Sequence, residues 1–192
     1  MNITMHPRLA KFISSVGSPV LLFPLVISIL FIRKLGMARA VPMVSTVCAI
    51  FAALSLFLLI RKIRGSITDL DVSDQKQRAA NVFLPVIVML LLAVGYFYLT
   101  NQPFVGETLY VGGLLGVCFA INAVKKISMH TVVAIYLSTI IVPISPWLGL
   151  ASVLFSGLIA WSRIVLGRHT QDEVLLGWLV GTGFGLLHSY LF

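Results

Sequence analysis

Residues 82–100 read VFLPVIVMLLLAVGYFYLT, a run without one charged side chain. A helix needs about 20 mostly apolar residues to cross the hydrocarbon layer of a bilayer, and this run has that length. A segment exposed to lipid must also satisfy its own backbone hydrogen bonds, which a helix does. The run therefore predicts a transmembrane helix.

Further apolar runs lie on both sides of this segment. They cover residues 17–35, 41–60, 107–124, 131–144, 147–162 and 173–192. The boundary between the fifth and sixth of the seven runs is the turn around Ser145 and Pro146, because proline disfavours helix in the residue before it. The sequence predicts an all-α, polytopic transmembrane bundle of seven helices, or six if one run is short, tilted or re-entrant. His188, inside the last run, is expected to form an interhelical hydrogen bond.

The composition supports a membrane protein and excludes a soluble one. Hydrophobic residues make up 59% of the 192 residues, charged residues make up 10%, and the mean hydropathy is +1.04. Soluble domains carry about 25% charged residues. A soluble core of this size could not bury so much apolar surface, whereas a bilayer can cover it. The length is that of a single integral membrane domain, residues 1–192.

The basic residues indicate the kind of partner. The net charge is +8, and the bases lie in short loops between apolar runs, with no run of five or more. A nucleic-acid-binding arm would need such a run, so nucleic acid is not expected as a partner. Anionic lipid headgroups are the expected partners of these loops.

The order of the spans brings three polar loops together. With seven spans, the loops at residues 61–81, 125–130 and 163–172 all fall on the same side of the membrane. These loops hold most of the polar side chains with catalytic potential. The sequence therefore predicts one site at one membrane surface.

The last of these loops reads SRIVLGRHTQDE over residues 162–173. His169 and Glu173 are four residues apart, so both lie on one face if a helix begins here. A carboxylate that holds one imidazole nitrogen leaves the other available as a nucleophile. Arg163 offers a planar set of donors that matches phosphate oxygens. An interfacial loop that contacts headgroups is the alternative.

The other two loops add bases, acids and one more histidine. Lys126, Ser128 and His130 lie between two apolar runs, where Ser128 could cap the following helix and His130 could serve as a general acid. Residues 69–78 read DLDVSDQKQR, with three acids before Lys76 and Arg78. The acids do not have the spacing of a calcium-binding loop, and a solvated loop is the alternative to a metal site.

The motif at residues 162–173 resembles the third signature of the type 2 phosphatidic acid phosphatase superfamily, which includes the vanadium haloperoxidases. That signature is S-R-x5-H-x3-D. Ser162, Arg163 and His169 are in register with it, and Glu173 stands at the Asp position. Residues 174–181 are similar to the helix that follows in the family.

The two other family signatures match in part. The second, P-S-G-H, is matched by Ser128 and His130, with Ile127 and Met129 at the Pro and Gly positions. The first is K-x6-R-P, in which Arg78 matches the Arg. Its Lys and Pro positions are Asp71 and Ala79, so Lys76 is the candidate replacement for the Lys. The resemblance covers residues 69–181 and implies a helical core like that of the superfamily.

The resemblance also implies a function. It implies a metal-independent and cofactor-independent phosphatase that acts on a membrane lipid monophosphate or diphosphate. His169 is then the nucleophile that forms a phosphohistidine, Glu173 orients it, and His130 is the general acid and base. The implied phosphate-binding residues are Arg163, Arg78, Ser128, Lys126 and Lys76.

Two alternatives remain open at the level of the sequence. A phosphotransferase of the same architecture would pass the phosphate to another lipid or to a sugar. A non-enzymatic membrane protein would use the basic loops only to bind anionic lipids. Phosphatidate, phosphatidylglycerophosphate and polyprenyl diphosphates all present a suitable phosphate at the membrane surface.

The distribution of bases predicts the side of the membrane on which the site lies. Loops rich in Lys and Arg remain on the cytoplasmic side. When the bases assigned to phosphate and Arg168 are set aside, six bases remain on the motif side and three on the opposite side. The sequence therefore predicts a site on the cytoplasmic face.

Overall fold

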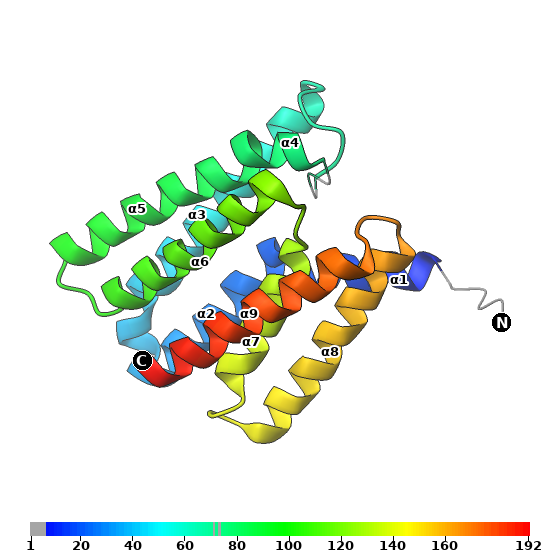
Figure 1. Ribbon diagram of the computed structural model, residues 1–192. Helices are drawn as coiled ribbons and strands as arrows, with labels where there is room; N and C mark the ends of the chain where they lie inside the picture. The colour runs from blue at the N-terminus through cyan, green and yellow to red at the C-terminus, as the bar shows by residue number, and fades with distance from the viewer. Residues whose placement is uncertain (1–6, 71, 73) are drawn as a thin grey trace. The chain divides into compact units, whose positions relative to one another are not determined.

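The computed structural model describes residues 7–70, 72 and 74–192, and all regular elements in that part of the chain are helical. The elements are α1 (Pro7–Val16), α2 (Pro19–Leu35), α3 (Met37–Ile63), α4 (Gln75–Arg78), the π-helical turn η1 (Ala79–Phe83), α5 (Leu84–Leu99), α6 (Val105–Val124), α7 (Met129–Ile141), α8 (Pro146–Val165) and α9 (Gln171–Leu191) (Figure 1). The all-α class predicted from the sequence is confirmed.

Each predicted apolar run forms a helix, but in the part of the chain that the structure describes fewer than seven helices are long enough to span a bilayer. Five of those described qualify by length and composition: α3, the continuous Gln75–Leu99 helix, α6, α8 and α9. The pair α1 and α2, which is bent by 43°, would make a sixth. The described residues therefore agree with the alternative of six spans, if the bent pair is one span, and not with seven. The reason is α7, whose 13 residues rise only about 20 Å, against a hydrocarbon layer of about 30 Å.

The helices form two compact units. The terminal unit contains the chain up to Val26 together with Ile127–Phe192, and the central unit contains Ile27–Lys126. The terminal unit thus holds α1, the first half of α2, and α7 to α9. The central unit holds the rest of α2 and α3 to α6.

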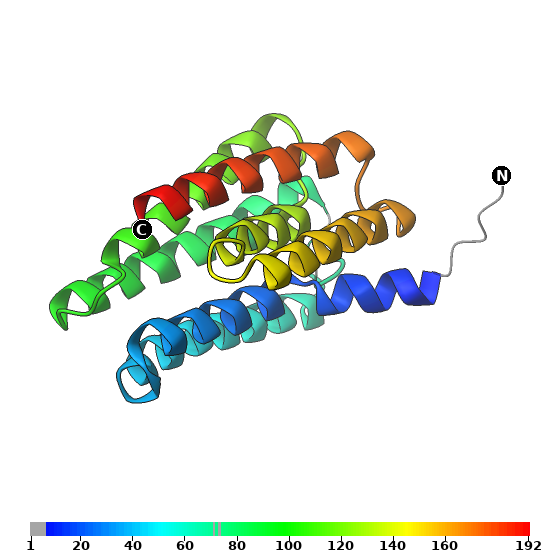
Figure 2. The same ribbon diagram turned by 90° about the horizontal axis from the view of Figure 1, so that it is seen from below.

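Helix α7 is the core of the terminal unit. It packs against both α8 and α9, which have little contact with each other (Figure 1 and Figure 2). All residues from His130 to Ile140 are buried. A helix that is covered by protein on all sides does not need the length of a lipid-exposed span, because its neighbours line the bilayer instead.

Glycines on α9 allow this close packing. Gly177, Gly181 and Gly185 are four residues apart and therefore share one helix face. A Cβ atom at Gly181 would overlap the carbonyl oxygen of Val132 on α7. Small residues let helix backbones approach closely in membranes, where no hydrophobic driving force between helices is available.

Helices α7 and α9 are also joined by a polar contact between their side chains. The Tyr136 hydroxyl on α7 lies 3.1 Å from Nδ1 of His188 on α9. The interhelical hydrogen bond predicted for His188 is confirmed.

The central unit has its polar loop at the end where α6 terminates. Gln75 Nε2 donates to the Asn122 carbonyl oxygen at 2.5 Å, and Asn122 Nδ2 donates to the Gln75 carbonyl oxygen at 3.3 Å. In the first turn of the long helix, Asn81 Nδ2 donates to the Gln77 carbonyl oxygen at 2.7 Å. That oxygen would otherwise accept the Asn81 backbone N–H of an α-helix, which accounts for the π-helical turn at this point.

Candidate active site

The end of α8 places the backbone of His169 next to Arg163. Gly167 has φ of +63°, a conformation that favours glycine. The N–H of Gly167 donates to the Ile164 carbonyl at 2.9 Å, and the N–H of Arg168 donates to the Arg163 carbonyl at 3.0 Å. This pair of bonds is the Schellman pattern of a helix C-terminus. The N–H of His169 donates to the same Arg163 carbonyl at 3.3 Å, so the spacing between Arg163 and His169 follows from the turn that ends α8.

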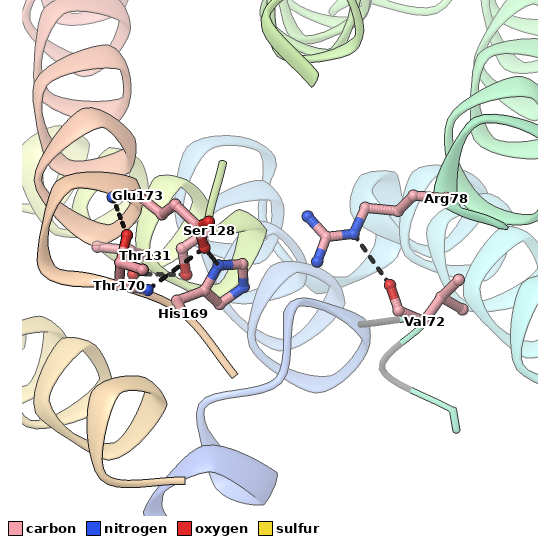
Figure 3. Close-up of polar contacts among 7 residues, drawn as sticks. All are labelled: Val72, Arg78, Ser128, Thr131, His169, Thr170 and Glu173. Atoms are coloured by element: carbon pink, nitrogen blue, oxygen red, sulfur yellow. Dashed lines mark hydrogen bonds and ion pairs between the residues drawn. The ribbon is translucent and has the colours of Figure 1, made fainter. Parts of the chain in front are cut away.

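The start of α9 fixes the side chain of His169. Thr170 is the N-cap, and its hydroxyl accepts from the Glu173 N–H at 3.3 Å. Glu173 Oε2 accepts in return from the Thr170 N–H at 3.4 Å, which completes a capping box. The same Oε2 lies 2.6 Å from Nδ1 of His169 (Figure 3). The carboxylate is therefore held by the helix terminus that it caps, and it holds the imidazole in turn.

The start of α7 joins this cluster. The Ser128 N–H donates to the Glu173 carbonyl at 3.2 Å, which ties the beginning of α7 to the first turn of α9. Ser128 is the N-cap residue of α7, but its side chain makes no capping hydrogen bond. Its hydroxyl instead accepts from the Thr131 hydroxyl at 2.9 Å (Figure 3). His130 follows two residues later and is buried.

Arg163 itself is buried, with 1% of its surface exposed. Its Nη1 donates to the Ser14 hydroxyl on α1 at 2.5 Å. Ser14 is also buried, so the contact lies inside the protein. A charged guanidinium removed from water must be compensated by hydrogen bonds or by a paired charge. This burial distinguishes Arg163 from an arginine that only reaches toward headgroups.

The terminal unit contains five of the residues predicted from the sequence: Arg163, His169, Glu173, Ser128 and His130. Hydrogen bonds link Ser128, His169 and Glu173, and the backbone carbonyl of Arg163 accepts from His169, whereas His130 lies in the first turn of α7, two residues after Ser128. Their connections come from three helix termini: the end of α8, the start of α9 and the start of α7. Segments more than 30 positions apart in the chain therefore contribute to one polar cluster.

Three further predicted residues belong to the central unit. Arg78 is buried, and its Nε donates to the Val72 carbonyl at 3.0 Å (Figure 3). Val72 has φ of +45°, which is strained for a β-branched residue, so this carbonyl is presented by an unusual backbone conformation. Lys76 is exposed. Because residues two positions apart on a helix do not share a face, Lys76 and Arg78 point in different directions. Lys126 is the last residue of the unit and is half-buried.

Three residues of the terminal site were not anticipated from the sequence. Ser14 contacts Arg163 across a separation of 149 residues, and no local pattern indicates such a contact. Thr170 and Gly167 could have been found. The order Thr170-x-x-Glu173 is the capping-box signature, and a glycine just after an apolar helical run indicates a helix C-terminus.

Of the three acidic residues before Arg78, the structure describes Asp69 and Asp74. Asp71 lies outside the described residues. Within the residues that are described, no three His, Cys, Asp or Glu side chains are grouped so that they could hold a metal ion.

No model of a known protein family, no curated protein and no solved structure matches the chain.

Proposed function

We propose that this chain is a metal-independent lipid phosphate phosphatase in which His169 is the nucleophile. The observation that carries the proposal is the 2.6 Å contact between His169 Nδ1 and Glu173 Oε2, beside the buried Arg163. A carboxylate at Nδ1 stabilises the tautomer with its proton on Nδ1. It thereby makes Nε2 the atom with the lone pair that can attack.

In the proposed reaction, Nε2 of His169 attacks the phosphorus of a lipid phosphate. The N–P bond forms as the bond between phosphorus and the leaving oxygen breaks, and His130 donates a proton to that oxygen. His130 then removes a proton from water, which attacks the phosphohistidine and releases inorganic phosphate. Glu173 stabilises the positive charge that the imidazole acquires in the first step.

The equatorial phosphate oxygens need donors in both steps, because negative charge is spread over them. Arg163 and Ser128 are the candidates in the terminal unit. Arg78, Lys126 and Lys76, which the resemblance implied as further donors, belong to the central unit, and no role for them is part of this proposal.

The position of the cluster supports a lipid as the substrate. Helices α8 and α9 are both long and apolar enough to cross a membrane, and Arg163 and His169 lie where one ends and the other begins. At that level the cluster is within reach of the phosphate of a lipid headgroup, which favours a lipid as the substrate. We propose that this end of the protein faces the cytoplasm.

The test is to trap the intermediate and follow the products. Purified protein is incubated with phosphatidate, phosphatidylglycerophosphate or a polyprenyl diphosphate carrying a labelled terminal phosphate, and is quenched early. We expect an acid-labile label on His169, with release of inorganic phosphate.

His169→Ala should lose both the label and turnover, whereas the control His188→Ala, near the end of α9 and outside the cluster, should keep both. Labelling or turnover that survives His169→Ala would refute the assignment. Transfer of the label to a second lipid or to a sugar would indicate a phosphotransferase. Absence of label and turnover with all three lipids would leave lipid binding as the role of the basic loops.

A further inference from the structure

Helix α1 has three distinct faces, of which only one is used for packing inside the unit. At 100° per residue, its buried residues Ala10, Ile13 and Ser14 form one stripe. The exposed residues form two others. The basic and polar stripe consists of Arg8, Lys11 and Ser15, and the apolar stripe consists of Leu9, Phe12 and Val16. Phe12 is 66% exposed, which is a large apolar area for a position next to two bases.

Helix α1 runs antiparallel to α8. Ser14 contacts Arg163 in the last turn of α8, whereas a Cβ atom at Gly17 would lie 2.5 Å from Ile159, one turn earlier. The beginning of α1 therefore extends past the level of Arg163. With a rise of 1.5 Å per residue, Lys11 lies about 4.5 Å and Arg8 about 9 Å beyond Ser14 along this axis.

This direction places the two bases at a membrane surface. Helix α8 is long and apolar enough to span a bilayer, and it ends at Val165, just after Arg163. The part of α1 beyond that level therefore leaves the hydrocarbon layer. A helix with adjacent basic and apolar stripes at this depth has the pattern of an interfacial helix.

We propose that α1 binds anionic phospholipid headgroups through Arg8 and Lys11, with Leu9, Phe12 and Val16 inserted at the acyl boundary, and that it thereby holds Arg163 in place through Ser14. Only the role of Arg163 in phosphate binding rests on the proposed function. The binding of anionic lipid by α1 rests on its faces and its position alone.

The choice of an anionic lipid over another partner follows from charge. Both titratable residues of α1 are basic, and no acid lies between Pro7 and Val16. Anionic lipid attracts such bases with an energy that corresponds to about a fivefold gain in affinity for each. The exposed apolar stripe lies beside these bases, so one partner must offer an apolar surface and negative charge within a few ångströms of each other. The boundary between the acyl chains and the anionic headgroups of a bilayer has both.

The coupling between α1 and Arg163 follows from the buried face of α1, which contains Ser14. The hydroxyl of Ser14 accepts from Nη1 of Arg163 at 2.5 Å, and both side chains are buried. A shift of α1 along or away from α8 would break this bond. Lipid binding that anchors α1 therefore restrains the guanidinium, and Ser14 acts as a positioning residue.

The first experiment tests lipid binding without reference to activity. The full chain is purified in mixed micelles of phosphatidylcholine and phosphatidylglycerol, and retained lipid is counted by native mass spectrometry. The variant Arg8→Gln/Lys11→Gln should bind phosphatidylglycerol about thirtyfold more weakly than wild type. The control Arg33→Gln/Arg39→Gln removes two exposed bases from the central unit and should lose less phosphatidylglycerol than Arg8→Gln/Lys11→Gln. Equal retention of phosphatidylglycerol by all three proteins would overturn the proposal.

The second experiment tests the coupling, with inorganic phosphate as the probe. Its affinity is read from the shift that it causes in thermal unfolding, so no turnover is required. Ser14→Ala should weaken phosphate binding about tenfold, because a hydrogen bond to a charged group is lost, and Ser14→Thr should restore it. Arg8→Gln/Lys11→Gln should weaken phosphate binding in membranes that contain phosphatidylglycerol and leave it unchanged in pure phosphatidylcholine.

The outcomes distinguish the coupling of α1 to Arg163 from lipid binding by α1 and from the proposed hydrolysis of lipid phosphate. Unchanged phosphate affinity in Ser14→Ala would refute the coupling, even if α1 binds lipid. A protein that binds phosphate and phosphatidylglycerol as expected but hydrolyses none of the lipids would refute the proposed function and leave this inference standing.

Discussion

Glu173→Gln is the substitution that isolates the orienting role of the carboxylate. Glu173 Oε2 accepts both from His169 Nδ1 at 2.6 Å and from the Thr170 N–H at 3.4 Å. Glutamine can replace glutamate in a capping box, because its amide oxygen also accepts from the N-cap N–H. The start of α9 should therefore remain folded, and any loss of activity can be assigned to His169.

The magnitude follows from the two effects of removing the charge. A hydrogen bond to a charged group contributes about 1.5–3 kcal/mol, and its loss in the transition state would slow the reaction by about 10- to 150-fold. In addition, the amide NH₂ of glutamine can donate to Nδ1. The ring proton then moves to Nε2, which removes the lone pair that must attack phosphorus. We therefore expect kcat/KM to fall by about 10²-fold or more.

The assay measures phosphate release from a lipid phosphate in mixed micelles, together with thermal unfolding of each protein. Asp172→Asn is the matched control, since Asp172 lies in the same helical turn but is exposed. Both substitutions remove one negative charge near the start of α9. A negative charge at a helix N-terminus stabilises the helix by about 0.3–1 kcal/mol, so each substitution destabilises it. Their melting temperatures should therefore fall by similar amounts. If Asp172→Asn loses more activity than Glu173→Gln, or if Glu173→Gln stays within about threefold of wild type, the orienting role is wrong.

Three further predictions concern packing, metal dependence and orientation. Gly181→Ala should lower the free energy of unfolding by about 1–3 kcal/mol, because its Cβ meets the backbone of α7. Gly183→Ala, with nothing within 4 Å of its Cβ, should be neutral or stabilising in the same denaturation experiment. Phosphatase activity should survive EDTA, and a loss that Mg²⁺ reverses would indicate a metal at the acidic residues before Arg78. In a cysteine-free background in intact cells, a cysteine at Gln75 should resist an impermeant maleimide and one at Gln102 should react, whereas the reverse pattern would place the site on the outer face.

The elements of the fold could be predicted from the sequence because each depends on local properties. Apolar runs of about 20 residues form helices wherever a bilayer leaves the backbone no other partner. The spacing of Arg163, His169 and Glu173 is local as well. It arises from one helix that ends at a glycine and another that begins at a capping box, so the contact between His169 and Glu173 follows from residues within one short segment.

The short core helix could not be predicted in the same way. The run from 131 to 144 looks like its neighbours in hydropathy, yet α7 has only 13 residues and is buried on all sides. Burial of this kind depends on which helices surround it. In apolar helices every face has similar hydropathy, so the sequence contains little information on which face packs against which neighbour.

The long-range polar contacts were decided by tertiary structure alone. Ser14 meets Arg163 because α1 packs against α8, and Ser128 meets Glu173 because glycines let α7 and α9 approach. The sequence alone determined a multi-pass helical protein and the short segment that positions His169 beside Glu173. Tertiary structure determined which distant side chains surround that segment, because their positions depend on helix packing, whereas the segment depends only on its own backbone hydrogen bonds.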